Sequence, residues 1–218
     1  MTQKAELYAY LKSRFQAEEP IFLAELKVPD MPDENVRNQM RKLATDGLLC
    51  RFDNGIYFLP RESPSRFGPV LSLESVIRKK YLTDADVPCG YYSGLTFANL
   101  IGVTTQVPMV YEICTNKTTS DRQMIHLAGR RVILSMPRVP VDGDNVLELQ
   151  FLDLLTDITA ISELEGKALT DRLKKYMRSC GLGFDRLERH LPYYPNRIYK
   201  NMYEAGLLKG VVIQKGTR

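Results

Sequence analysis

The sequence predicts a mixed α/β (α+β) protein of two domains, and three observations lead to this expectation. The chain has 218 residues, about the length of two compact domains. Apolar residues at helical spacing and short alternating runs occur in the first sixty residues and again after residue 70. Between these regions, residues 61–70 are rich in Pro, Ser and Gly, which is typical of a linker. We therefore expect one domain over residues 1–60 and a second over residues 71–218.

The first elements follow from apolar spacing and from prolines. Apolar residues recur near helical spacing over residues 3–16, which predicts a helix. Residues 20–26, PIFLAEL, predict a short extended start that passes into a second helix. Residues 27–34 contain two prolines and several acids and are predicted as a turn, with Asp30 or Asp33 capping the next helix.

A third helix and a hairpin complete the first domain. The helix is expected to end before Gly47, and its apolar stripe consists of Val36, Met40, Leu43 and Ala44. Asn54-Gly55 then separates two apolar runs and predicts a hairpin, because both residues tolerate positive φ. Helix, strand, helix, turn, helix and hairpin follow in the order of a winged helix-turn-helix.

The third helix directs polar and basic side chains away from its apolar stripe. Arg forms bidentate bonds to guanine, Asn does so to adenine, and both Arg and Lys bind phosphates. We therefore predict double-stranded DNA as a partner, bound by Asn35, Arg37, Asn38, Arg41 and Lys42 of the helix and by Arg51 and Asn54 of the hairpin. A solvated helix face, or a winged helix that binds protein, is the alternative, since residues 1–60 carry eight basic and nine acidic side chains.

The second domain is predicted to mix strands and helices and to end in a helical part. Strand-like runs occupy residues 109–116, 123–129 and 130–137, the last two joined by a turn at Ala128-Gly129. Helices are expected over residues 72–82, 92–102 and 146–158, and after Gly166.

The basic bias of the chain, whose net charge is +4, lies at its C-terminal end. Residues 160–218 carry twelve basic and six acidic side chains. Residues 193–213 place Gly-Leu-Leu between a helix and a strand-like run, as residues 33–60 do, so they form either a common helix-to-strand junction or a second helix-turn-helix-like element. Basic and aromatic residues here are candidates for contact with nucleic acid or an acidic partner: Lys174, Lys175, Arg178, Arg197, Tyr199, Lys200 and Tyr203.

The N-terminal pattern is followed by a helix of the form Tyr-Ser-Gly-Leu to Leu-Ile-Gly over residues 92–102, the TTQVP segment of residues 104–108, and a strand from Met109. In these features, residues 1 to about 140 resemble the AbiEi-type antitoxins of bacterial type IV toxin–antitoxin pairs. Such antitoxins join a winged helix-turn-helix to an antitoxin domain, bind repeats in their own promoter and repress the operon. Their second domain counteracts a nucleotidyltransferase-type toxin.

The resemblance implies a DNA-binding autorepressor whose functional counterpart is such a toxin. Tyr91, Tyr92 and Thr96 are then candidates for a partner surface, whereas packing of the helix over residues 92–102 in the core is the alternative. Two other functions remain open from the residues. One is a winged-helix regulator with a ligand-sensing second domain, and the other is a protein-binding module that does not contact DNA.

The sequence predicts no enzyme, no cofactor and no metal site. The four cysteines are far apart without a CxxC, and the chain has two histidines, so a zinc site is not expected. Cys114 stands where an E-x-K nuclease strand beginning at Glu112 would need Lys, and the glycine patterns of phosphate loops are absent. Reduced thiols and the lack of an apolar run of membrane-spanning length predict a cytoplasmic protein without membrane contact.

Overall fold

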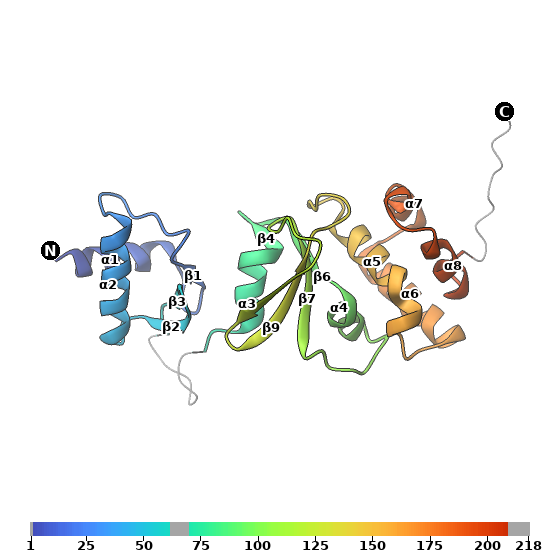
Figure 1. The fold of residues 1–218 in the computed structure, drawn as a ribbon, viewed down its shortest axis with the longest axis horizontal. Coiled ribbons are helices and arrows are strands. Elements are labelled where there is room, and N and C mark those ends of the chain that lie inside the picture. Colours follow the sequence, from blue (N-terminus) through green and yellow to red (C-terminus); the bar gives the residue numbers. More distant parts are fainter. Residues whose placement is uncertain (1, 62–69, 209–218) are drawn as a thin grey trace. The chain divides into compact units, whose positions relative to one another are not determined.

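A computed structural model describes residues 2–61 and 70–208 as a mixed α+β protein (Figure 1). The predicted fold class is therefore confirmed. The chain divides into unit 1, Met1–Lys80, and unit 2, Tyr81–Arg218. Residues 62–69, most of the expected linker, and residues 209–213, the strand-like run near the C-terminus, lie outside the described residues.

Lys79 shows why residues 71–80 belong with unit 1, although the sequence suggested that they begin the second domain. Its ammonium group donates hydrogen bonds to Glu19 Oε1 at 2.6 Å and to the Pro20 carbonyl at 2.8 Å. The same group lies 4.9 Å from the ring centroid of Phe15. The segment that follows the linker therefore returns to the N-terminal residues.

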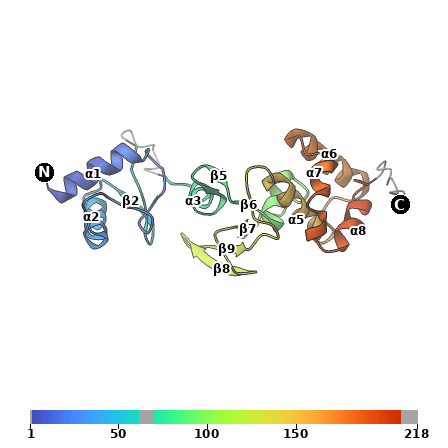
Figure 2. The same ribbon diagram turned by 90° about the horizontal axis from the view of Figure 1, so that it is seen from above.

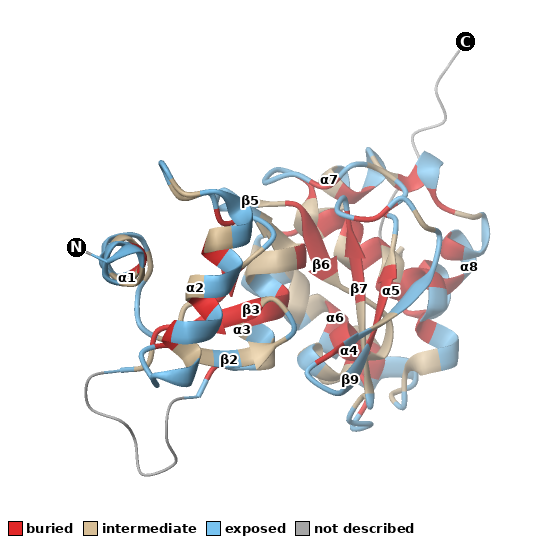
Figure 3. Cartoon of the chain, turned by 60° about the vertical axis from the view of Figure 1, so that its left-hand side comes forward, coloured by how far each residue is buried: buried red, intermediate tan, exposed pale blue. Residues whose placement is uncertain are grey.

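Unit 1 combines two helices of more than ten residues with a three-stranded antiparallel sheet in the order β1-β3-β2. Strand β3 is buried along its length and lies within the core of this unit (Figure 3). The elements are α1 (Gln3–Arg14), β1 (Ile21–Phe22), α2 (Asp33–Thr45), β2 (Cys50–Asp53), β3 (Ile56–Phe58) and α3 (Leu73–Ile77). The core residues from these elements and their flanks are Leu7, Leu11, Ile21, Leu26, Val36, Met40, Leu43, Leu49, Tyr57 and Leu59.

The second helix predicted within residues 20–26 is wrong, because strand β1 is followed there by turns over residues 23–25. Strand β1 pairs with β3, and the Leu23 N–H donates to the Gly55 carbonyl at 2.9 Å. A segment this short between two prolines gains little from forming a helix. Pairing with the hairpin instead gives its backbone groups partners.

The ends of α2 differ from expectation at the N-terminus and agree with it at the C-terminus. Pro32 occupies the N-cap position and makes no side-chain bond, while Asp33 pairs with Lys27 at 2.9 Å. Capping by Asp30 or Asp33 is therefore wrong. Gly47 adopts φ 73°, which confirms the predicted stop.

The predicted hairpin at Asn54-Gly55 is confirmed. Gly55 supplies the positive φ of 71° at this turn. The register of β2 against β3 shifts between Arg51 and Asp53, which adds a bulge beside the turn.

Unit 2 is built on a four-stranded sheet in the order β6-β7-β9-β8, with β7 parallel to β9 and the other pairs antiparallel. Strand β8 forms one edge of this sheet (Figure 2). The three predicted strands and the turn at Ala128-Gly129 are confirmed. The elements from the end of unit 1 onward are η1, a π-helical turn (Arg78–Leu82), β4 (Thr83–Asp84), β5 (Val87–Pro88), β6 (Gly90–Tyr92), α4 (Gly94–Ile101), β7 (Val110–Thr115), β8 (Gln123–Leu127), β9 (Arg130–Ser135), α5 (Val146–Ile161), α6 (Gly166–Cys180), α7 (Phe184–Glu188), η2 (Leu191–Tyr193) and α8 (Arg197–Glu204).

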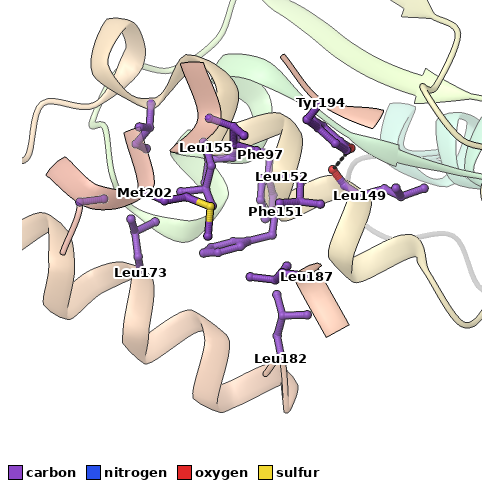
Figure 4. Packing of buried hydrophobic residues seen from close by; sticks show 14 of the residues in the cluster. Phe97, Leu149, Phe151, Leu152, Leu155, Leu173, Leu182, Leu187, Tyr194 and Met202 are labelled. Atoms are coloured by element: carbon purple, nitrogen blue, oxygen red, sulfur yellow. Dashed lines mark hydrogen bonds between the residues drawn. The ribbon is translucent and has the colours of Figure 1, made fainter. Parts of the chain in front are cut away.

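Helix α5 is the centre of the unit 2 core. Its side chains pack against those of α4, α6, α7 and α8 (Figure 4). Phe151 stacks on Tyr176 of α6 with ring centroids 5.7 Å apart. The Tyr194 hydroxyl donates to the Leu149 carbonyl at 3.1 Å. Each large apolar side chain buried here contributes about 1.5–3 kcal/mol to stability. Helix α5 is thereby fixed as a rigid support for the polar side chains it carries.

None of the helices within residues 2–61 and 70–208 has both the length and the apolar character needed to cross a bilayer.

Candidate functional site

The outer face of α2 is solvent-exposed, as the sequence predicts. Arg37, Asn38, Arg41 and Lys42 are exposed, Asn35 is half-buried, and the stripe of Val36, Met40 and Leu43 is buried. The division follows from helical spacing, because residues three and four apart share a face. The side chains that would contact DNA therefore stand free of the core.

One acid at each end of α2 is paired with a lysine, which reduces the negative charge beside its basic face. Lys27 lies 2.9 Å from Asp33, and Lys4 lies 2.7 Å from Asp46. The hydrogen bond and the charge of Lys27 lower the pKa of the Asp33 carboxyl. Within the described part of the chain, neither Arg41 nor Lys42 has an ion-pair partner. Their charges are available to an external anion.

The hairpin holds Arg51 and Asn54 against each other. Arg51 Nη2 donates to Asn54 Oδ1 at 3.2 Å, and Arg51 Nε donates to the Asp53 carbonyl at 3.3 Å. A guanidinium has five N–H donors, so three remain for a phosphate. The contact fixes the guanidinium beside the tip of the hairpin.

One pocket brings the helix and the hairpin together. Arg37 of α2 and Asn54 of the hairpin both line a hollow of about 270 Å³, together with Leu23, Glu25 and Lys80. The face of α2 that carries Arg37 and the turn of the hairpin therefore open on the same side of unit 1. A helix and an adjoining hairpin on one side suit a groove and its flanking backbone.

Two of the candidate partner residues in unit 2 are structural, which corrects the expectation for them. Tyr91 is 3% exposed and Thr96 is 4% exposed. Thr96 Oγ1 accepts a hydrogen bond from the Glu112 N–H at 2.9 Å, which ties α4 to β7. Tyr92 is half-buried, and its ring centroid lies 6.3 Å from that of Tyr111. Tyr91 and Thr96 are therefore packed inside unit 2, although their polar groups had made them candidates for a partner surface.

Two of the basic candidates near the C-terminus form ion pairs within unit 2. Arg197 is tied to α5, since it donates to Asp157 Oδ1 at 2.7 Å and to the Thr156 carbonyl at 3.2 Å. Lys200 forms an exposed pair with Glu204 at 3.7 Å. The remaining candidates are half-buried Lys174 and exposed Lys175, Arg178, Tyr199 and Tyr203.

Gly94 and Glu112 explain the Tyr-Ser-Gly-Leu stretch at the start of α4. Glu112 Oε2 accepts a hydrogen bond from the Leu95 N–H at 2.9 Å, so the carboxylate meets the positive end of the helix. A Cβ at Gly94 would collide with this carboxylate, and Gly94 has φ 51°. Glu112 therefore serves α4 as a capping residue supplied by a neighbouring strand.

A larger pocket, of about 600 Å³, lies in unit 2, and the sequence did not predict it. Its floor is one face of the sheet, because Glu112 and Cys114 of β7 stand opposite Ile133 and Ser135 of β9 in the parallel register. Helix α5 covers this face with three residues at i, i+3 and i+4: Asp153, Thr156 and Asp157. Asp121, Arg122, Arg138 and Tyr193 also line the pocket.

Asp153 is the central polar group of this pocket, and its side chain is 18% exposed. Its Oδ2 accepts hydrogen bonds from the Tyr91 hydroxyl at 2.7 Å and the Cys114 thiol at 3.3 Å. Its Oδ1 lies 3.9 Å from Arg138 Nε, beyond hydrogen-bond distance. Burial raises the pKa of Asp153, and the bonds from Tyr91 and Cys114 and the charge of Arg138 oppose that rise.

The thiol of Cys114 in this pocket is not activated as a nucleophile. Burial, together with the neighbouring Asp153 carboxylate, raises the pKa of the Cys114 thiol to about 12. A thiol that stays protonated near neutral pH is a poor nucleophile. Among the residues that the structure describes, no group of three or more His, Cys, Asp or Glu side chains is arranged to hold a metal ion.

The sequence offered little to reveal this pocket. The hydrogen-bond partners of Asp153 come from two strands that precede it by 62 and 39 residues. Residues 146–158 contain three acids, Glu148, Asp153 and Asp157, and nothing in the sequence marks Asp153 as the central one of a pocket.

Neither the models of known protein families nor the curated proteins contain a match to this chain.

Proposed function

We propose that this protein is a DNA-binding transcriptional repressor of its own operon. Unit 1 reads double-stranded DNA with the outer face of α2, and the β2–β3 hairpin contacts the flanking backbone or minor groove. The observation that carries the proposal is the shared side of Arg37 and Asn54, which joins the exposed Arg and Asn side chains of α2 to the hairpin in one surface. Strand β1 stands where a helix-turn-helix has its second helix, and Arg37 and Asn54 still share one surface.

Binding of the intact protein to the duplex upstream of its gene tests the proposal. Arg37→Ala with Arg41→Ala removes two exposed charges from the outer face of α2. Lys12→Ala with Arg14→Ala removes two exposed charges from α1 and is the matched control. We expect loss of binding in the first variant and retention in the second. Equal binding by the two variants would show that α2 is not the reading element.

The resemblance to AbiEi-type antitoxins extends the proposal to a role in the cytoplasm as the antitoxin of a toxin–antitoxin pair. Its counterpart would be a nucleotidyltransferase-type toxin, and the protein itself would act without enzymatic activity or a cofactor. Expression together with a nucleotidyltransferase-like product of the neighbouring gene tests this role. The intact chain should restore growth. The variant with Arg37→Ala and Arg41→Ala should also restore growth if the antitoxin activity belongs to unit 2. Growth arrest in the presence of the intact chain would contradict the antitoxin role.

A second candidate function is favoured by the 600 Å³ pocket of unit 2, which has the size of a small-molecule site. In this alternative, unit 2 senses a ligand and changes DNA binding by unit 1. Screening for compounds that change the affinity for DNA separates it from a repressor without a ligand.

A further inference from the structure

We propose, on the basis of the ligand-sensing function suggested for unit 2, that its polar pocket binds a small organic cation through a guanidinium or primary ammonium group. Asp153 is the principal acceptor, and the hydroxyl of Ser135 lies on the same pocket wall.

The charge of the lining favours a cation. Four carboxylates and two guanidinium groups line the pocket: Glu112, Asp121, Asp153 and Asp157 against Arg122 and Arg138. Two of the carboxylates are already compensated. Glu112 accepts from the Leu95 N–H and lies 3.6 Å from Arg122, while Asp157 pairs with Arg197. Arg138 is the one remaining cation of the lining for Asp121 and Asp153, so the lining carries an excess negative charge when Asp153 is ionised.

Asp153 presents an acceptor that is open to the pocket. The hydrogen bonds from Tyr91 and Cys114 both reach Oδ2, and in the described residues the cation beside Oδ1 is Arg138 at 3.9 Å. The Tyr194 hydroxyl also interacts with this carboxylate. A partly buried carboxylate oxygen without a full hydrogen bond gains most from a charged donor. An incoming N–H group would complete its coordination.

Arg138 shows that the site suits a guanidinium. Its guanidinium carbon lies 5.3 Å from the ring centroid of Tyr194, and its Nε faces Asp153. The Asp153 carboxylate and the face of Tyr194 together hold this guanidinium, although Tyr194 itself does not line the pocket. Because the Arg138 side chain is 44% exposed, it stands at the edge of the pocket and competes with a ligand for Asp153.

Isothermal titration of the intact protein with four matched probes tests the proposal. The probes are n-butylguanidinium, n-butylammonium, the neutral isostere n-butylurea and the anion n-butyl phosphate. We expect at least one of the cations to bind tenfold or more tightly than both n-butylurea and n-butyl phosphate. Binding of the neutral or anionic probe as tightly as of both cations would overturn the proposal.

Two substitutions with opposite effects determine which charge the ligand carries. Asp153→Asn should weaken binding of the preferred cation at least tenfold, whereas Arg138→Ala should strengthen it severalfold by removing the competing guanidinium. Asp171→Asn, an exposed carboxylate on α6 away from the pocket, should leave the affinity unchanged. Weaker cation binding by Arg138→Ala, or unchanged binding by Asp153→Asn, would contradict the assignment. If Asp153→Asn fails to fold, Asp121→Asn, which changes an exposed pocket residue, replaces it and should weaken binding.

A short peptide with blocked termini and a central arginine as its one charged side chain distinguishes a free compound from a side chain of a protein partner. Binding by this peptide without binding by either free cation would overturn the small-molecule assignment. The affinity for upstream DNA, measured with and without the bound cation, is a separate readout. Cation binding that leaves the affinity for DNA unchanged would refute ligand sensing but support the cation site. The absence of cation binding would refute the cation site itself.

Discussion

The Tyr91 hydroxyl donates a 2.7 Å hydrogen bond to Asp153 Oδ2, and this bond fastens strand β6 to helix α5 across 62 residues of sequence. The bond is charge-assisted when Asp153 is ionised, which is the stronger class of hydrogen bond. It therefore both supports the unit 2 core and orients the carboxylate at the pocket.

Tyr91→Phe should destabilise unit 2 by about 1.5–3 kcal/mol, the usual value for a hydrogen bond to a charged group. Urea denaturation at neutral pH measures the change. Tyr199→Phe, which alters an exposed tyrosine of α8, serves as the control and should be nearly neutral. Equal stability of the two variants would mean that the Cys114 thiol alone satisfies Asp153.

The stability of the protein should fall as the pH rises through the titration of Asp153. Its pKa is raised in the folded state, so between the ordinary aspartate value of about 4 and that raised value the folded chain binds the proton more tightly than the unfolded chain. The free energy of unfolding then decreases with rising pH in this window. The groups facing Asp153 are Tyr91, Cys114, Arg138 and Tyr194.

Asp153→Asn removes this titration, so the free energy of unfolding of the wild type minus that of the variant should decrease as the pH rises. Denaturation of both proteins between pH 4 and pH 8 gives this difference. A difference that stays constant or increases with pH would show that the pKa of Asp153 is not raised.

Arg37→Ala and Asn38→Ala should each relax sequence preference on the upstream DNA, at a cost of about 1–3 kcal/mol if they contact bases. Both side chains are exposed, so the fold should be retained. Competition between the native site and sites with single base changes measures the preference. Discrimination as sharp as that of the wild type would mean that these side chains do not read bases.

Arg51→Ala should weaken binding to all duplexes alike and reduce the salt dependence of binding by about one unit of slope. Arg51→Lys is the informative comparison, because it keeps the charge but loses the planar group that joins Asn54 to the Asp53 carbonyl. Titrations at several salt concentrations should give a wild-type slope for the lysine variant. An unchanged slope in the alanine variant would indicate that the hairpin makes no phosphate contact.

Arg186→Ala should destabilise unit 2 by about 3–5 kcal/mol, because it leaves a buried carboxylate without its cation. The partner is Glu148 on α5, whose side chain is 2% exposed. Its Oε2 has no hydrogen-bond partner in the part of the chain that the structure describes. Thermal and urea denaturation should also show that replacing both residues with Met recovers most of the loss. Lys200→Ala, which breaks an exposed pair, should cost less than about 1 kcal/mol.

Local patterns sufficed for the elements whose structure is decided by neighbouring residues. The spacing of Val36, Met40 and Leu43 predicted the buried stripe of α2, and Gly47 and Asn54-Gly55 predicted its end and the hairpin. The helix expected within residues 20–26 was wrong because pairing with β3, a distant partner, determines the backbone there.

The pocket of unit 2 could not be predicted from local sequence patterns, because its side chains also come from distant segments of the chain. Asp153, Cys114 and Arg138 come from α5, β7 and the segment after β9, and each has an ordinary neighbourhood in the sequence. Tyr91 and Thr96 suggested a surface by their polarity, although the fold buries them. Side chains that are brought together only by the sheet topology have no characteristic spacing in the sequence.

The collision between a Cβ at position 94 and the Glu112 carboxylate links two positions that lie on different elements. With φ 51°, position 94 favours glycine whatever residue stands at 112, and a Cβ there would also displace the carboxylate from the Leu95 N–H. Loss of the glycine would therefore remove the cap of α4 even where Glu112 is retained. In diverged descendants of this chain, glutamate at 112 should occur together with glycine at 94, and replacement of the glycine should coincide with a new N-cap within the sequence of α4 itself.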